Sequence, residues 1–193
     1  MELRIAADGE IEARAASIFK GYFKDPAATR EVFTDDGWFK TGDIGVLDPD
    51  GYLRITDRKK NILITAGGKN ITPSNIEYEV KACLPLISFC HLHADRRPYP
   101  VALVCLDKLA LDQLAAERGL ASGALEAHAR GLVQGAIDRA NERFAQFERI
   151  KRFAILPAEL SVEAGELTPT MKVKRREVDR KYAATLDALY AEA

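Results

Sequence analysis

Short runs of alternating apolar and polar residues fill the first part of the chain, to about residue 57. The stretch LRIAADGEIEARA has two such runs around Asp8-Gly9, and VLDPDGYLRITD repeats the design around Asp50-Gly51. An Asp-Gly pair between two alternating runs is a strong local signal for a β-hairpin. The intervening FKDPAATREVF predicts a short helix that begins at its proline. We therefore expect turn-rich β structure with one short helix.

Three bulky aromatic residues of this first part, Phe33, Trp38 and Phe39, need to be covered by other side chains. A sheet of few strands offers little apolar surface for that purpose. We expect the first part to be marginally stable by itself.

From Arg58 onward the apolar runs lengthen and helical spacing begins. NILITAGGKNITP has two β-branched runs around Gly67-Gly68, which predicts a third hairpin. In SNIEYEVKACL, Ser74 and Glu77 have the spacing of a capping box, so a helix should begin there and end before Pro85. Four apolar residues share one face of this helix: Ile76, Val80, Cys83 and Leu84.

Two β-rich runs, ISFCHLHAD and PVALVCLD, follow on either side of the turn-like RRPYP and predict a central antiparallel or mixed sheet. KLALDQLAAERG reads as a helix that ends at Gly119, and GALEAHARGLVQGAIDRANERFAQF has helical spacing throughout. IKRFAILPA predicts a last strand. One face of a C-terminal helix would then carry Val178, Tyr182, Leu186, Leu189 and Tyr190.

These elements predict an α+β fold in two parts. Residues 1–57 would be a β-rich fragment, and residues 58–193 a small domain of helices packed on a small mixed or antiparallel sheet. The junction TDRKKN lacks the composition of a flexible linker, so any movement there would be a hinge of a few residues.

Charge and cysteine content limit the partners and the compartment. With 28 Lys+Arg against 29 Asp+Glu the net charge is −1, so nothing global indicates nucleic acid or an anionic membrane, and any basic site must be local. Cys83, Cys90 and Cys105 form neither a CxxC pair nor an even set, which favours a reducing, cytoplasmic location. The N-terminus has no signal or transit character, and no stretch approaches the roughly 20 apolar residues of a membrane span.

Two motifs of the first half could carry chemistry. In TGDIG, Asp43 could accept two hydrogen bonds from a vicinal diol such as a ribose, although a carboxylate that caps its own turn is the plainer interpretation. Gly67 and Gly68 could let a thin ligand approach the backbone, although a tight turn explains them equally well.

Lys172 follows the loop ELTPT and precedes a helix. It could neutralise a phosphate or a developing oxyanion, or it could be one charge of a solvated helix start shared with Lys174, Arg175 and Arg176. His91 and His93 lie two apart on a predicted strand and share a face, but no third ligand is near in the sequence, so we expect no metal site.

Taken in order, these motifs resemble the C-terminal portion of the adenylate-forming acyl-CoA synthetases, most closely the long-chain fatty-acid–CoA ligases. The matching text is IFKGYFKDPAATREVFTDDGWFKTGDIGVLDPDGYLRITDRKKNILITAGGKNITPSNIE and, further along, ELTPTMKVKRREV. The resemblance covers nearly the whole chain and is weakest from Lys108 to Phe147. Several ordered motifs are far more specific than any one alone, and they favour the functional interpretation of each.

The resemblance implies a two-step reaction. A fatty acid and MgATP give an acyl-adenylate and pyrophosphate, and coenzyme A then displaces AMP to form the thioester. By resemblance, Asp43 and Arg58 would bind the nucleotide ribose, and Lys60 would be the hinge about which the small domain rotates. Gly67 and Gly68 would line the pantetheine route of coenzyme A. Lys172 would contact the carboxylate and the α-phosphate during adenylation.

The family's phosphate-binding loop, acyl pocket and Mg²⁺ ligands would precede this chain, so residues 1–57 resemble the last β subdomain of an incomplete large domain. We therefore expect an enzyme fragment that is inactive alone, with the missing large domain as its partner. A homodimer through the uncovered surface, and at most peripheral membrane association of the parent protein, are further expectations. Two alternatives stay open: a free-standing nucleotide-binding, coenzyme A-binding or protein-interaction module, and an amino-acid or aryl-acid adenylating domain. A large exposed apolar patch on residues 1–57 would favour the fragment over the module.

Overall fold

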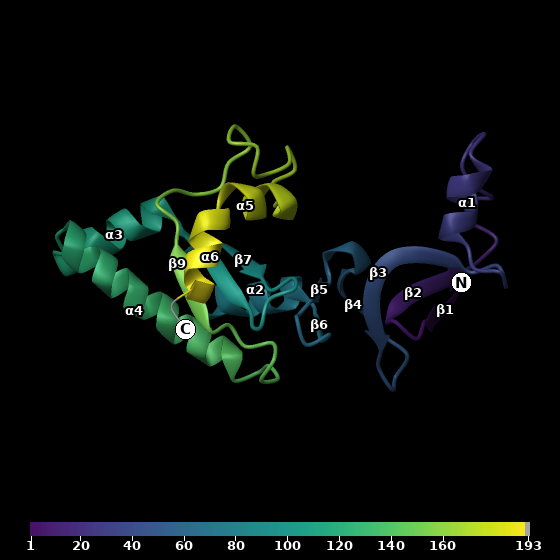
Figure 1. Ribbon diagram of the computed structural model, residues 1–193, viewed down its shortest axis with the longest axis horizontal. Coiled ribbons are helices and arrows are strands. Elements are labelled where there is room, and N and C mark those ends of the chain that lie inside the picture. The colour runs from purple at the N-terminus through teal and green to yellow at the C-terminus, as the bar shows by residue number, and fades with distance from the viewer. Residues whose placement is uncertain (192–193) are drawn as a thin grey trace. The chain divides into compact units, whose positions relative to one another are not determined.

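The computed structural model describes residues 1–191, which divide into two compact units (Figure 1). Unit 1 is Met1–Ile62, and unit 2 begins at Leu63. The unit boundary thus falls a few residues after the one expected from the sequence.

Unit 1 is a four-stranded antiparallel sheet in the order β1-β2-β3-β4. Its elements are β1 (Glu2–Ile5), β2 (Glu10–Arg14), α1 (Pro26–Val32), β3 (Phe39–Leu47), β4 (Leu53–Arg58) and the 3-10 turn η1 (Lys59–Asn61). The hairpins at Asp8-Gly9 and Asp50-Gly51 are confirmed, since they join β1 to β2 and β3 to β4. Helix α1 has Pro26 in its first turn, and the Asp25 side chain accepts a hydrogen bond from Ala28 N as its N-cap.

The core of unit 1 is small. Its buried apolar residues are Ile11, Ala13 and Trp38. The guanidinium groups of Arg4 and Arg14 both pack on the Trp38 ring, with their Cζ atoms 4.5 and 4.4 Å from the ring centroid. Such an arrangement covers an aromatic ring with the planar heads of charged side chains rather than with apolar ones.

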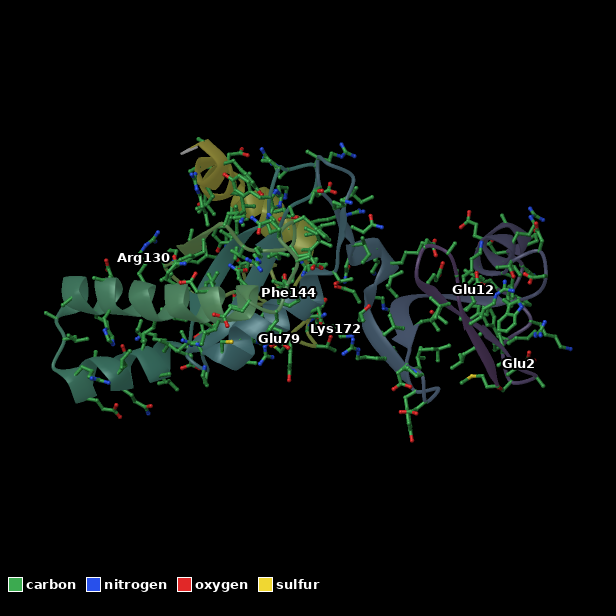
Figure 2. The ribbon with its side chains drawn as sticks, turned by 90° about the horizontal axis from the view of Figure 1, so that it is seen from below. Glu2, Glu12, Glu79, Arg130, Phe144 and Lys172 are labelled. Carbon is green, nitrogen blue, oxygen red and sulfur yellow. The ribbon has the colours of Figure 1, made fainter. Side chains whose placement is uncertain are left out.

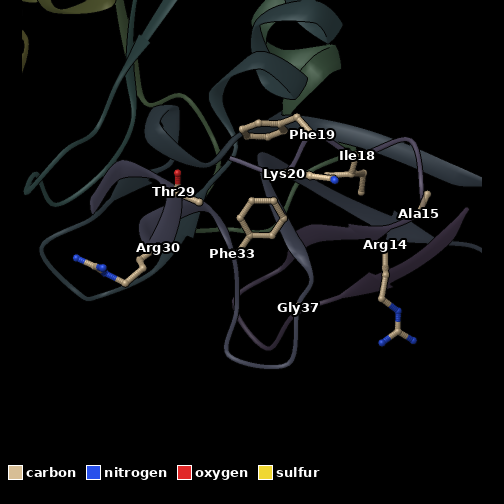
Figure 3. A pocket seen from close by; sticks show the side chains of 9 residues that line it. All are labelled: Arg14, Ala15, Ile18, Phe19, Lys20, Thr29, Arg30, Phe33 and Gly37. Atoms are coloured by element: carbon tan, nitrogen blue, oxygen red, sulfur yellow. The ribbon is translucent and has the colours of Figure 1, made fainter. Parts of the chain in front are cut away.

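A separate aromatic cluster lies on unit 1 where α1 meets β3. Phe19 contacts Phe33, Phe39 and Tyr22, with ring centroids 5.1 to 5.7 Å apart. Phe19 and Phe33 also line an open hollow of about 450 Å³, shown in Figure 3. Of the three aromatic residues that were expected to need cover, Phe33 and Phe39 therefore join this cluster and stay partly exposed, whereas Trp38 is buried.

Unit 2 is built on a mixed three-stranded sheet, as expected. The order is β7-β8-β9, with β7 antiparallel and β9 parallel to the central β8. The elements are β5 (Leu63–Ile64), β6 (Asn70–Ile71), α2 (Pro73–Cys83), β7 (Ile87–His93), β8 (Val101–Leu106), α3 (Lys108–Arg118), α4 (Ser122–Asn141), β9 (Arg152–Ile155), α5 (Arg175–Lys181) and α6 (Ala183–Ala191).

Side chains of β8 alternate between two apolar clusters, one on each face of the sheet. Ala102 and Val104 join a cluster with α2 and α4, whereas Val101, Leu103 and Cys105 join a cluster with α5 and α6. Unit 2 is therefore a sheet between two helical layers. In the layer of α2 and α4, Arg143, two residues after the end of α4, forms an ion pair with Glu79 of α2 at 2.6 Å (Figure 2 labels Glu79).

The capping box expected at Ser74 and Glu77 is wrong. Helix α2 begins at Pro73 with Thr72 as its N-cap, so Ser74 already lies inside the first turn. The Glu77 carboxylate instead accepts hydrogen bonds from Leu92 N and from the Arg175 guanidinium. Glu77 thus has tertiary partners in β7 and at the start of α5.

Two other helices differ from their predicted extent. Helix α4 ends at Asn141, because the Asn141 side chain bonds both the N–H and the carbonyl of Ile150, each at 2.9 Å, and turns the chain back toward β9. The C-terminal helix is two helices, α5 and α6, separated at Tyr182. The expected apolar face is kept, since Val178 and Leu186 are buried.

All three cysteines are free thiols, with Cys90 and Cys105 buried. Burial raises the pKa of both thiols, that of Cys105 to about 11. Within residues 1–191, no helix combines the length and the apolar character needed to cross a bilayer.

Candidate functional site

Unit 1 brings Asp43 and Arg58 together. They are partners in the register of the antiparallel pair β3–β4, and Arg58 Nε lies 2.8 Å from Asp43 Oδ1. The Asp43 side chain keeps 24% of its surface exposed and that of Arg58 keeps 59%. A carboxylate and a guanidinium therefore stand side by side at the surface of the sheet.

The backbone before Asp43 is held by neighbouring side chains. Thr41 Oγ1 accepts the N–H of Asp43 at 3.1 Å and donates to the carbonyl of Ile11 at 2.7 Å. Asp43 therefore lies inside strand β3 rather than in the expected turn, and its carboxylate pairs with Arg58. A Cβ at Gly45 would lie 2.7 Å from the Arg54 carbonyl, so close strand approach requires the second glycine of TGDIG.

Glu10 is a buried carboxylate that the sequence analysis missed. Its Oε1 accepts the N–H of Gly42 at 2.9 Å, and its Oε2 accepts Lys59 Nζ at 2.8 Å. Lys59 also bonds Asp8 at 2.7 Å, which lowers the pKa of the Asp8 carboxyl and raises that of the Lys59 ammonium. The alternation of residues around Glu10 could not show that its carboxylate is buried and bonded, because Gly42 and Lys59, its partners, lie more than thirty residues away in the sequence.

Lys60, the expected hinge residue, lies in η1 at the end of unit 1 and has an exposed side chain. Its neighbour Lys59 is fixed by two carboxylates, as described above. The two adjacent lysines therefore differ in environment.

The Gly67-Gly68 turn is the tip of the hairpin β5–β6 in unit 2. Gly68 has φ +72°, a left-handed conformation that favours glycine, so the turn itself requires this residue. A Cβ at Gly67 would have its nearest neighbour at 4.0 Å, so packing does not require the other glycine. The hairpin is tied to the turn after β7, because Arg96 N donates to Ile64 O and Ala66 N to Arg97 O.

Lys172 is exposed on a closed loop between β9 and α5 (Figure 2). Thr168 closes the loop twice: its N–H donates to the carbonyl of Lys172 at 2.8 Å, and its hydroxyl accepts the N–H of Lys172 at 3.0 Å. Leu167 and Val173 form an antiparallel bridge one residue further down. The ammonium is therefore presented from a backbone that is held on both sides.

Arg175, three residues after Lys172, has a different role from its cationic neighbours. It bonds both oxygens of Glu77 and the carbonyl of Leu92, and its side chain is only 17% exposed. It fixes the start of α5 to α2 and β7. The cationic run KVKRR thus combines an exposed lysine with a structural arginine.

His91 and His93 share one partner, Asp179 of α5. His91 Nε2 lies 2.8 Å and His93 Nδ1 3.0 Å from Asp179 Oδ1. Burial by itself would raise the pKa of the Asp179 carboxyl, but the hydrogen bonds from the two histidines outweigh it and hold the pKa well below its ordinary value. Among residues 1–191, no group of three or more His, Cys, Asp or Glu side chains is arranged to hold a metal ion.

Relatives of known name match almost the whole chain. Long-chain-fatty-acid–CoA ligase FadD15 of Mycobacterium tuberculosis is 42% identical over 194 residues, which cover 97% of this chain and 32% of that protein. Long chain acyl-CoA synthetase 7, peroxisomal, of Arabidopsis thaliana is 38% identical, over 95% of this chain and 27% of that protein. The chain therefore spans about a third of the length of the curated relatives it matches.

Solved structures agree with the fold. The adenylation domain of a carboxylate reductase from Mycobacterium chelonae superimposes with a TM-score of 0.75 at 29% identity, over 95% of this chain and 28% of that one. The model of the AMP-binding enzyme C-terminal domain matches residues 60–193. Since that match takes in well over half of the residues, the chain belongs to the family of AMP-binding enzyme C-terminal domains.

Proposed function

We propose that this chain is the C-terminal part of an ATP-dependent, AMP-forming long-chain fatty-acid–CoA ligase. The observation that carries the proposal is the 42% identity, over 97% of the chain, to a protein named as such a ligase. Residues 1–57 would complete the large domain, and residues 58–193 would be the mobile small domain. The rest of the large domain, as the partner of this chain, would hold the fatty acid.

Asp43 and Arg58 would bind the nucleotide of ATP. The two hydroxyls of a ribose can both donate to one carboxylate, and Asp43 is partly exposed with a guanidinium at 2.8 Å that orients it. Asp43 and Arg58 fit a nucleotide because the carboxylate can accept from the ribose diol, and the guanidinium beside it is a cation for the phosphates. The Mg²⁺ that accompanies ATP would take its ligands from residues outside this chain.

Lys172 would act in the first half-reaction. Attack of a carboxylate on the α-phosphate brings two anions together, and an ammonium placed between them stabilises the charge that develops and orients the attack. The closed loop 168–172 presents the side chain to solvent, where a substrate bound to the large domain could meet it. A lysine on a rotating domain can also leave when the second step begins.

Gly67-Gly68 and Lys60 would serve the second half-reaction. Neither the backbone conformation nor the packing of this chain requires glycine at position 67. A glycine there would leave room beside the backbone for the narrow pantetheine chain of coenzyme A. Lys60, in the short turn at the end of unit 1, would be the hinge. A cytoplasmic location, favoured by the three free cysteines, belongs to the same proposal.

A free-standing binding module is the competing function. The surface of unit 1 argues against it, because its large apolar side chains are widely exposed: Phe19, Tyr22, Phe23, Val46, Leu47, Tyr52 and Ile55. An independent module would be expected to cover such a surface. An amino-acid or aryl-acid adenylating domain is the second alternative, and the 42% identity to a long-chain fatty-acid–CoA ligase favours the fatty-acid ligase over it.

The proposal is tested by fatty-acid-dependent exchange of pyrophosphate into ATP. We would assay this chain alone and a longer protein in which the upstream part of its own gene, or of a close relative, precedes Met1. Exchange is expected only from the longer protein. Lys172→Ala should reduce it by about 100- to 1000-fold, since it removes the charge that stabilises the reacting anions.

Arg176→Ala is the matched control, because it removes one exposed positive charge from the same run. It should leave exchange within about twofold of the parent. Exchange by the short chain itself, or equal activity of Lys172→Ala and Arg176→Ala, would contradict the proposal.

A further inference from the structure

Glu166 is a buried carboxylate to which the proposed chemistry gives no role. Its side chain is 2% exposed, so it cannot contact a substrate. Three donors nevertheless converge on it: Lys181 Nζ and the Tyr182 hydroxyl reach Oε1, each at 2.7 Å, and Ser161 N reaches Oε2 at 2.9 Å.

The same residue is at the base of the Lys172 loop. The carbonyl of Glu166 accepts Lys174 N at 2.8 Å, and the next rung is the Leu167–Val173 bridge. Above that, the two Thr168–Lys172 bonds close the loop. Residues 166–168 and 172–174 therefore pair in one short antiparallel ladder, which begins at Glu166 and ends at the Lys172 loop.

The partners of Glu166 connect this ladder to the end of helix α5. Lys181 is the last residue of α5, and Tyr182 separates α5 from α6. Burial by itself would raise the pKa of the Glu166 carboxyl, but the bonds from Lys181, Ser161 and Tyr182 outweigh it and lower the pKa. Lys181 thus supplies a positive charge beside the buried carboxylate of Glu166. Leu167, the residue after Glu166, is fully buried.

We propose that Glu166 is a positioning residue for Lys172: by tying the loop base to Lys181 and Tyr182, it makes the loop and α5 a single rigid element. This inference rests on the proposed function, in which Lys172 must stand between two anions within a few tenths of an ångström. Without the tie, Lys172 would keep its charge but sample many positions. Glu166 acts only through Lys172 and never touches substrate.

The first test uses the 193-residue chain itself and does not depend on catalysis. Deuterium uptake is followed by mass spectrometry in the peptide that covers residues 167–174, for Glu166→Gln, Lys181→Met and the double variant. Each single variant should speed exchange in this peptide by about tenfold, and the double variant should add little more, because both remove the same tie. Uptake in β8 reports whether the sheet is intact.

Glu177→Gln is the matched control. Glu177 is a half-exposed carboxylate on α5 that pairs with Arg180 at 2.6 Å, so the substitution removes the same charge from the same helix without touching the loop base. It should leave exchange of residues 167–174 unchanged. Equal exchange in Glu166→Gln, Lys181→Met and Glu177→Gln would overturn the proposal.

The second test separates positioning from general loss of structure. In the longer protein, Glu166→Gln should lower kcat of pyrophosphate exchange by about tenfold, while thioester formation from a preformed acyl-adenylate stays within twofold. An equal loss in both half-reactions would overturn the positioning role. If Lys172→Ala leaves pyrophosphate exchange intact, the proposed function fails. Faster deuterium uptake of residues 167–174 in Glu166→Gln and Lys181→Met would still establish the tie between the loop and α5.

Discussion

The two units contain similar hairpins but differ in how much apolar surface they bury. In unit 2, β8 feeds two apolar clusters, and residues such as Ile76, Val80 and Leu103 have at most 1% of their surface exposed. In unit 1 three apolar residues are buried, and two arginine guanidinium groups pack on the ring of the single tryptophan. A sheet with helices on both faces is complete by itself, whereas a one-layered sheet with exposed aromatics depends on further structure.

The largest expected effect is a separation of the two units during unfolding. Trp38 lies in unit 1 and is the only tryptophan of the chain, whereas helices α2 to α6 belong to unit 2. In urea, Trp38 fluorescence should therefore report a transition about 1 M below the one seen by circular dichroism at 222 nm. Coincident transitions would mean that the units unfold together and would break the comparison.

Excision provides the control for this prediction. Residues 63–193 should keep a cooperative thermal transition when produced alone, because both apolar clusters lie within them. Residues 1–62 should unfold at a lower temperature and less cooperatively, since only three of their apolar side chains are buried. A transition of the isolated 1–62 segment as high and as sharp as that of residues 63–193 would contradict the contrast.

A pair of isoleucine substitutions gives the next largest effect. Ile76 in α2 is fully buried and Ile55 in β4 is 60% exposed. Ile76→Ala should lower the free energy of unfolding of unit 2 by about 2–5 kcal/mol, because it removes buried methylene groups and leaves a cavity. Ile55→Ala should change the stability of unit 1 by less than about 0.5 kcal/mol. Urea denaturation followed by both probes measures the two values in the same chain.

Elements with a local signal could be predicted from the sequence. The Asp-Gly hairpins, the Pro26 helix and the apolar face of α2 depend on residues within a few positions of each other, and the structure confirms them. The pairing of Asp43 with Arg58 follows from the hairpin register, whereas the resemblance suggested only that both residues bind the nucleotide.

What could not be predicted depends on distant partners. Glu77 has the spacing of a capping residue, but it binds Arg175 from a segment almost a hundred positions away. Glu10 and Glu166 look like surface carboxylates in the sequence, yet both are buried, and each is bonded by a lysine that only the fold brings to it. Tertiary charge pairing overrides local propensity at these positions, and no single sequence shows which lysine will arrive.

The smallest expected effect concerns two aspartates whose pKa is lowered by hydrogen bonds from different partners and whose exposure to water differs. Asp179 in unit 2 is bonded by His91 and His93 and is only 35% exposed, whereas Asp36 in unit 1 is bonded by Arg4 and is 58% exposed. Water screens the exposed pair, so its contribution to stability should be the smaller of the two. The same direction of pKa shift therefore has different consequences in the two units.

Asp179→Asn should destabilise unit 2 by about 1 kcal/mol at pH 7. Because the folded pKa of Asp179 is lower than its ordinary value of 3.8, the stabilisation is fully present above pH 3.8 and is lost as the pH falls below it. The difference between Asp179→Asn and the parent should thus shrink between pH 4 and pH 2, as measured by urea midpoints at 222 nm. Asp36→Asn should shift the Trp38 midpoint by less, and 0.5 M salt should remove that shift. A salt-sensitive effect at Asp179, or a larger effect at Asp36, would show that burial is not what distinguishes the two carboxylates.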